Sequence, residues 1–234
     1  MQNNQRIIGI FGAGGFLGRH LIRHLTKLDY RIKVGTSNPF LKNYLLPLGN
    51  PGQISLFKTN IFNTEDIKEV LIDCDLVINL VGILYETKKQ KFQQIHVNFP
   101  NLLSEICNEL RISKLVHLSA IGANKDSQSK YQQSKFLGEQ ILLNNFPSTV
   151  ILRPSVVIGE EDNFTNLFAK LSMFPVLPIV RGQYKFQPIY VEDVAKAIAK
   201  IFEVQNNEGK IYELGGYQQI KVGDMRKGIV KIIN

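Results

Sequence analysis

The sequence predicts an α/β fold in which a doubly wound parallel sheet, with strand order 3-2-1-4-5-6, is followed by a small C-terminal substrate-side appendage. Short apolar runs alternate with segments of helical spacing, and a glycine-rich turn directly follows the first apolar run. The runs at residues 76–80 and 149–153 are apolar almost throughout, which is typical of strands covered on both faces. We therefore expect a large domain over residues 1–153. A smaller region over residues 154–234 follows, with segments (191–202 and 210–213) that return to the sheet.

The predicted elements follow one another in a regular order. Six strands are expected, at residues 6–11, 31–35, 54–58, 76–80, 114–118 and 149–153. A helix follows the first strand, because four leucines recur there at helical spacing (Leu17, Leu21, Leu25 and Leu28). Another helix follows the third strand, where Asn63 and Asp66 suit a reciprocal N-cap. Right-handed crossovers then place a ligand at the carboxyl ends of the strands.

The glycine-rich turn at residues 12–18 suits a dinucleotide pyrophosphate. Gly12 allows the tight turn, Gly15 removes a side chain where phosphate oxygens approach, and Gly18 lets the helix pack closely on the strand. The free N–H groups at the start of the helix then face the anion. The predicted cofactor-binding residues of this segment are Gly12, Gly14, Gly15, Phe16, Leu17 and Gly18.

A second group of residues carries candidate catalytic chemistry. Ser119 ends the fifth strand, and Tyr131 and Lys135 stand four residues apart at the start of the next helix. In this arrangement the ammonium lowers the pKa of the phenol and binds the nicotinamide ribose, the phenol exchanges a proton with a substrate, and Ser119 orients the substrate oxygen. Tyr85 and Lys89 have the same spacing but follow the fourth strand, so position favours the Tyr131 pair.

The end of the second strand, at residues 34–38, indicates the type of cofactor. Folds that prefer NAD place a carboxylate there for the ribose 2′-hydroxyl, and this chain has none. Thr36 and Ser37, together with Lys42, are the expected partners of a 2′-phosphate, so NADP(H) is favoured over NAD(H). The remaining predicted cofactor-binding residues are Asn60 and Ile61 near the adenine, Leu80, Val81 and Gly82 along the adenosine ribose, and Pro154, Ser155 and Val156 beside the nicotinamide.

Two histidine patterns receive structural interpretations. His20 and His24 have the spacing of a helical zinc pair but lack an adjacent glutamate and a third ligand. We expect no metal and interpret them as histidines on a helix surface. His117 lies in an apolar strand beside Ser119, and we expect a hydrogen-bonded core residue.

The composition limits the range of partners. The formal net charge of +8 is compatible with nucleic acid, an anionic membrane surface or an acidic protein. Basic residues are spread over the predicted helices, and their one cluster, at residues 88–91, has no aromatic residues interleaved for base stacking. We therefore expect no nucleic-acid partner and interpret the excess charge as solvated helix faces that also suit docking. No apolar run approaches the ~18 residues of a membrane span, so we expect no transmembrane segment.

Several stretches carry a resemblance to a known family. They lie at residues 12–19, 75–82, 114–123, 131–139, 151–162 and 186–194 and cover nearly the whole chain. With them the chain resembles the extended, atypical short-chain dehydrogenases/reductases. More closely, it resembles the family of the NADPH-binding accessory subunit of respiratory complex I (39-kDa, alpha-subcomplex-9 type) and its bacterial relatives. The resemblance implies a Rossmann fold that binds NAD(P)(H), with little or no established turnover in the respiratory subunit, whereas the bacterial relatives are described as oxidoreductases or epimerases.

This resemblance favours a structural or assembly role in the respiratory chain or in quinone metabolism. We expect a cytoplasmic protein that lies peripherally at the inner face of the inner membrane, with a dinucleotide and a membrane-associated respiratory complex or quinone-pathway proteins as partners. The small substrate-side region, and hence a small lid, is consistent with this. The alternative is a soluble NADP-dependent reductase or epimerase that uses Ser119, Tyr131 and Lys135. A redox-sensing regulator that reads the NADP(H) ratio is a third hypothesis.

Overall fold

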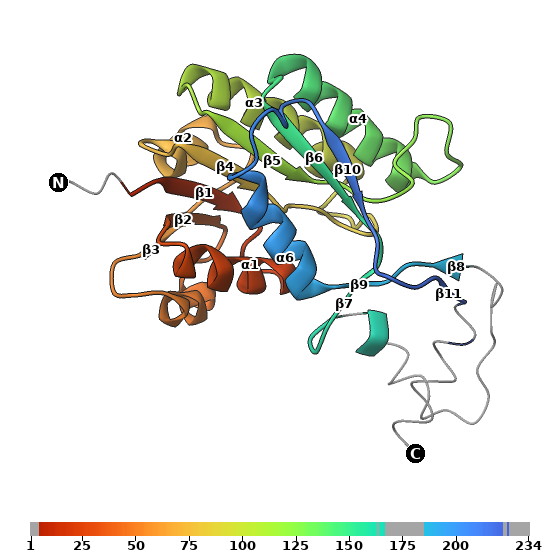
Figure 1. Cartoon of the computed structure of the whole chain (residues 1–234). Helices are drawn as coiled ribbons and strands as arrows, with labels where there is room; N and C mark the ends of the chain where they lie inside the picture. Colours follow the sequence, from red (N-terminus) through yellow and green to blue (C-terminus); the bar gives the residue numbers. More distant parts are fainter. Residues whose placement is uncertain (1–4, 163, 167–184, 222–223, 225–234) are drawn as a thin grey trace.

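The computed structural model describes residues 5–162, 164–166, 185–221 and 224, and its centre is a parallel sheet (Figure 1). The strand order β10-β6-β5-β4-β1-β2-β3 confirms the predicted order and adds one strand beside β6. All six predicted strands form, to within one residue at each end. The seven strands are β1 (Ile7–Phe11), β2 (Arg31–Thr36), β3 (Ile54–Lys58), β4 (Leu76–Asn79), β5 (Lys114–Leu118), β6 (Thr149–Pro154) and β10 (Ile211–Leu214).

Helices cover both faces of the sheet, which explains the nearly continuous apolar strands. On one face, α1 (Phe16–Lys27) and α6 (Val191–Ile201) pack on the sheet beside the 3-10 segment η1 (Phe40–Leu48). The other face carries α2 (Thr64–Leu71), the π-helical turn η2 (Gln93–Asn98), α3 (Phe99–Glu109) and α4 (Lys130–Asn145). Alternation along β1 sends Ile8 and Ile10 into the first core and Phe11 into the second.

Four short strands form two separate two-stranded sheets outside the large sheet. Strand β7 (Val157–Ile158) pairs with β9 (Ile189–Tyr190), and β8 (Lys185–Phe186) pairs with β11 (Ile220–Lys221). Figure 1 shows them beyond the end of the large sheet to which the strand arrows point. Within the described parts of the chain, none of the helices has the length and apolar character needed to cross a bilayer.

The two histidines of α1 do not lie free on a helix surface, so that prediction is wrong. His20 Nδ1 and His24 Nε2 each contact one carboxylate oxygen of Glu192, in the first turn of α6. Although desolvation pushes the pKa of Glu192 up, its bonds with both histidines lower it overall. The three side chains therefore form a hydrogen-bonded bridge between α1 and α6. Among the described residues, no group of three His, Cys, Asp or Glu side chains is arranged to hold a metal ion.

The cap of α2 is only partly as predicted. Asn63 accepts the backbone N–H of Asp66 at 3.1 Å, which confirms it as the N-cap. The carboxylate of Asp66 does not return to Asn63; it accepts the N–H of Asn60 at 2.7 Å instead. This bond fixes the turn after β3, which contributes one wall of the cavity described next.

Candidate functional site

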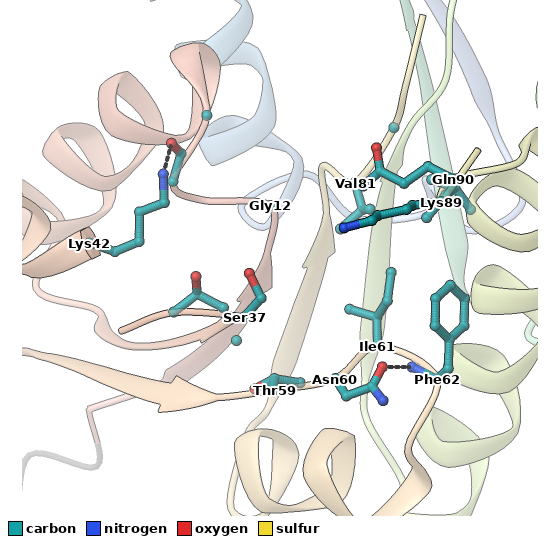
Figure 2. Close-up of a pocket in the computed structure, with 16 residues that line it drawn as sticks. Gly12, Ser37, Lys42, Thr59, Asn60, Ile61, Phe62, Val81, Lys89 and Gln90 are labelled. Atoms are coloured by element: carbon teal, nitrogen blue, oxygen red, sulfur yellow. Dashed lines mark hydrogen bonds between the residues drawn. The ribbon is translucent and has the colours of Figure 1, made fainter. Parts of the chain in front are cut away.

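A cavity of about 740 Å³ opens at the carboxyl ends of β1 to β4 (Figure 2). Strand order reverses between β2 and β4 on either side of β1, the place where doubly wound sheets bind ligands. Ten of the residues predicted to bind the cofactor line it: Gly12, Gly14, Gly15, Thr36, Ser37, Lys42, Asn60, Ile61, Val81 and Gly82. The other described lining residues are Gly35, Thr59, Phe62, Lys89, Gln90 and Ile95.

The glycine turn is shaped by close approaches of backbone to backbone. Gly12 has a φ of +84°, and a Cβ there would lie 2.8 Å from the carbonyl carbon of Leu80. At Gly18 a Cβ would lie 2.2 Å from the carbonyl oxygen of Ala13. Gly15 differs, because a Cβ there would meet only the oxygen of Gly12, at 3.4 Å. Gly12 and Gly18 are thus needed for the close backbone packing of the fold. The space over Gly15 is open on the cavity side, so a ligand can approach its backbone there.

The start of α1 offers backbone N–H groups to an anion. Gly15 occupies the N-cap position, no side chain caps the helix, and its first turn contains no acidic residue. The side chain of Leu17 is buried in the core, and the ring of Phe16 packs edge-on against His20. Phe16 and Leu17 can therefore bind a ligand here only through their backbone.

Lys42 brings a cation to the glycine turn from η1. Its Nζ donates a hydrogen bond to the carbonyl oxygen of Gly14 at 3.1 Å, and the hydroxyl of Tyr44 donates to the same oxygen at 2.9 Å. Figure 2 shows Lys42 and Ser37 on the same side of the cavity. This is the side on which a carboxylate would stand in a fold that prefers NAD.

Lys89 and Gln90 form part of the opposite wall, which the sequence analysis did not predict. Both belong to the loop after β4, and the hydroxyl of Thr87 accepts their backbone N–H groups at 3.3 and 3.0 Å. In Figure 2 Lys89 projects into the space facing Lys42. Among the described residues, the lining therefore contains two lysines and no carboxylate, so the cavity suits an anionic ligand.

The turn after β3 presents a polar group beside apolar surface. The side-chain oxygen of Asn60 accepts the N–H of Phe62 at 3.1 Å, so its amide nitrogen is the group that can donate to a ligand. Ile61 and Phe62 add apolar surface next to it. A polar edge beside an apolar face matches the requirements of a purine base.

The candidate catalytic residues lie next to this cavity rather than in its lining. Lys135 is only 3% exposed, and its Nζ donates to the carbonyl oxygen of Leu118 at 2.7 Å. A Cβ at Gly82 would lie 3.7 Å from that Nζ, so the two sites adjoin at Gly82. Burial disfavours the ammonium and lowers the pKa of Lys135 to about 8, with Glu139 partly opposing this.

Tyr131 differs from its predicted state. Burial raises the pKa of its phenol, so the expected lowering by Lys135 is wrong for this structure. Its ring packs edge-on against those of Phe92 and His96. His96 is itself fixed, because its Nε2 accepts the N–H of Ile83 at 3.0 Å and its Nδ1 lies 2.9 Å from the Ser134 hydroxyl. Burial, and then the charge of Lys135, lower the pKa of His96 to about 3, so the ring is neutral.

Three buried polar atoms at the ends of β4 and β5 have no hydrogen-bond partner in the part of the chain that the structure describes. They are Ser119 Oγ, His117 Nδ1 and Asn79 Nδ2. His117 is a core residue as predicted, but its Nδ1 is not hydrogen-bonded, and burial holds its pKa well below the usual value. Unsatisfied buried groups are costly. None of these three residues belongs to the described lining of the large cavity, so the fit to a dinucleotide rests on the glycine turn and on the lysines of the lining.

Residues 154–156 are separate from the large cavity. Ser155 lines a second cavity of about 220 Å³, together with Ile121, Lys185, Phe186, Gln187 and Gln219. The N–H of Ile121 donates to the carbonyl oxygen of Pro154 at 3.0 Å, and the carbonyl of Val156 accepts the N–H of Ile189. These residues thus lie beside the segment that carries Ser119, where the nicotinamide end of a dinucleotide is expected.

The chain is similar to two mitochondrial proteins named NADH dehydrogenase (ubiquinone) 1 alpha subcomplex subunit 9. It is 31% identical over 218 residues to that of Dictyostelium discoideum, which is 92% of this chain and 60% of the relative. It is 34% identical over 216 residues to that of Arabidopsis thaliana, which is 88% of this chain and 53% of the relative. The chain therefore spans 60% or less of the length of these relatives.

A similar solved structure and a family match complete the comparison. UDP-glucuronic acid 4-epimerase from Bacillus cereus, solved in complex with NAD, superposes with a TM-score of 0.82 at 24% identity. The match covers 97% of this chain and 83% of the epimerase, and it concerns the fold. Residues 8–215 match the sequence profile of the NAD dependent epimerase/dehydratase family. The chain belongs to the NAD dependent epimerase/dehydratase family.

Proposed function

We propose that this protein holds NADP(H) as a resident structural element and acts in the assembly of a membrane-associated respiratory complex. The observation that carries the dinucleotide part is the cavity, whose described lining combines the glycine turn with Lys42 and Lys89 and includes no carboxylate. The assembly part is supported by the relatives, which are subunits of NADH dehydrogenase. This chain matches 60% or less of their length, so the assembly part of the proposal concerns the portion that the two proteins share.

Each part of the dinucleotide has a proposed partner. The backbone of the glycine turn and the start of α1 hold the pyrophosphate. Asn60 donates to the adenine, and Ser37 and Lys42 hold the 2′-phosphate, with Thr36 beside them. Lys135 binds the nicotinamide ribose next to Gly82, and residues 154–156 flank the nicotinamide. When bound, the nicotinamide ring accepts or donates a hydride.

Two features favour a structural cofactor over turnover. Burial raises the pKa of Tyr131, which opposes proton release from the phenol. Lys135 directs its hydrogen bond to the carbonyl of Leu118 rather than to Tyr131. The alternative, a reductase or epimerase, is supported by the Oγ of Ser119, a buried hydroxyl that has no hydrogen-bond partner among the described residues and lies two residues before Ile121 of the second cavity.

Calorimetric titration with NADP(H) and NAD(H) tests the choice of cofactor. The wild type is expected to bind NADP(H) at least tenfold more tightly. Lys42→Ala removes a charge-assisted hydrogen bond worth about 1.5–3 kcal/mol, so NADP(H) affinity falls roughly tenfold or more while NAD(H) affinity stays within a few-fold. Lys88→Ala is the matched control, because Lys88 is an exposed lysine that does not line the cavity. Equal losses for both cofactors in Lys42→Ala, or tighter binding of NAD(H) by the wild type, would contradict the proposal.

A further inference from the structure

The loop between β4 and η2 has an outer side that the dinucleotide site does not use. Lys89 and Gln90 line the cavity, but Leu84 and Tyr85 are 72% and 73% exposed. These two large apolar side chains are adjacent in sequence and both exposed, and we call the pair the 84–85 tip. They also line a small surface cavity of about 220 Å³ with Ile83, Thr87 and Gln90. Scattered single apolar residues are normal on a surface, so it is this pair together with the charges beside it that indicates an interaction site.

The loop is held in shape by its own hydrogen bonds. The N–H of Thr87 donates to the carbonyl oxygen of Gln90 at 2.9 Å. The carboxylate of Glu86 accepts the N–H of Phe92 at 3.0 Å, which ties the loop to the start of η2. The 84–85 tip is therefore presented by a defined turn, so inserting it into a partner requires little ordering of the loop.

Basic side chains accompany the tip. Lys88, Lys89 and Lys91 lie within six residues of Tyr85 and are all exposed. Glu86 is the single acidic residue of the loop, and it lies 3.8 Å from the Nζ of Lys91. The loop thus keeps an excess of positive charge in a chain whose formal net charge is +8. A leucine and a tyrosine beside several lysines is the combination with which proteins bind the interface of an anionic membrane.

We propose that this loop docks the protein on an anionic lipid surface, with the 84–85 tip in the headgroup region and Lys88 and Lys91 against the lipid phosphates. A lipid surface is favoured over a protein because it accommodates two exposed apolar side chains beside several lysines and needs no complementary groove. Phe40 and Leu41 on η1 are also exposed, at 81% and 63%, but their neighbour Lys42 is engaged with Gly14. Of these two apolar pairs, the 84–85 tip is therefore the one accompanied by the charge that complements anionic lipid.

Co-sedimentation of the full chain with vesicles tests this docking. Vesicles of phosphatidylcholine alone are compared with vesicles that contain phosphatidylglycerol as well, at low and at high salt. The wild type is expected to bind the anionic vesicles, and salt is expected to weaken binding by screening. The double substitution Leu84→Ser/Tyr85→Ser, and separately Lys88→Gln, should each lower the bound fraction at least fivefold. The matched control Phe40→Ser/Leu41→Ser should bind like the wild type.

The folded state of each variant is checked by its melting temperature and its dinucleotide affinity, neither of which should change because the substituted side chains lie outside the cavity lining. Absence of binding to anionic vesicles, or equal binding to neutral vesicles, would overturn the proposal. The same holds if the control variant loses binding while the tip variant keeps it. If lipid fails and the tip substitutions instead abolish capture of a purified respiratory-complex subunit, the loop is a protein interface and the lipid proposal is wrong. Dinucleotide titration is independent of these outcomes.

Discussion

Replacement of Lys135 by methionine should stabilise the cofactor-free protein against unfolding. The ammonium is buried with one carbonyl acceptor, and its pKa is held at about 8 instead of 10.5. This shift corresponds to a cost on the order of 3 kcal/mol for carrying the charge at neutral pH. Loss of the hydrogen bond to Leu118 offsets about 1–2 kcal/mol of that. We therefore expect Lys135→Met to raise the free energy of unfolding by about 1–2 kcal/mol at neutral pH.

The pH dependence of the free energy of unfolding tests more sharply whether the cost comes from the buried ammonium of Lys135. Below about pH 8 the amine is charged in both the folded and the unfolded state, so the full burial cost is present. Between about pH 8 and 10.5 the folded state has released the proton while the unfolded chain retains it. The unfolded state then binds more protons, so the free energy of unfolding of the wild type rises with pH. By about pH 10 the advantage of Lys135→Met should shrink by roughly 2 kcal/mol, and the two curves should meet.

Urea unfolding of both proteins across this pH range measures the difference directly, because other titrating groups cancel between them. Lys88→Met serves as the control for an exposed lysine and should follow the wild type throughout. A constant difference between Lys135→Met and the wild type at every pH would refute the assignment of the cost to a buried ammonium. The variant should also bind the dinucleotide more weakly, since the same amine is proposed to hold the ribose.

Three further substitutions separate fold, binding and chemistry. Gly15→Ala should leave the melting temperature nearly unchanged but weaken NADP(H) binding at least tenfold in calorimetry, because its Cβ fits the fold and enters the phosphate position. Gly18→Ala should cost on the order of 3 kcal/mol in urea unfolding, because its Cβ meets the backbone of Ala13 at 2.2 Å; a loss below 1 kcal/mol would contradict this close packing. Tyr131→Phe should keep NADP(H) affinity within a few-fold and show the same background nucleotide oxidation as the wild type with quinones, aldehydes and ketones. A robust wild-type rate abolished in Tyr131→Phe would make the protein a reductase.

The parts of the fold that depend on local pattern could be predicted from the sequence. Apolar runs located the six strands, and the spacing of Gly12, Gly15 and Gly18 located the turn that borders the cavity. The apolar pattern also predicted that residues 210–213 return to the sheet, where the structure has β10 (Ile211–Leu214). The bridge from His20 and His24 to Glu192 could not be located in this way. The bridge joins residues about 170 positions apart, and no local pattern pairs two helices at such a distance.

The candidate site was predictable only where backbone shape determines it. Lys89 enters the cavity because a turn at Thr87 directs it there, and from sequence alone it is one lysine of a solvated cluster. The sign of the pKa shift at Tyr131 depends on how deeply the ring is buried, which spacing to Lys135 does not reveal. His96 was missed for the same reason, because its contacts come from the loop after β4 and from α4.

The central claim, a resident NADP(H), is tested most directly by mass spectrometry of the nucleotide released when the purified protein is denatured. The cavity with Lys42 and Lys89 predicts NADP or NADPH in an amount close to one per chain. Lys42→Ala should release much less of it, and Lys88→Ala as much as the wild type. Release of NAD or NADH in its place, or no dinucleotide from a folded wild-type protein, would contradict the account.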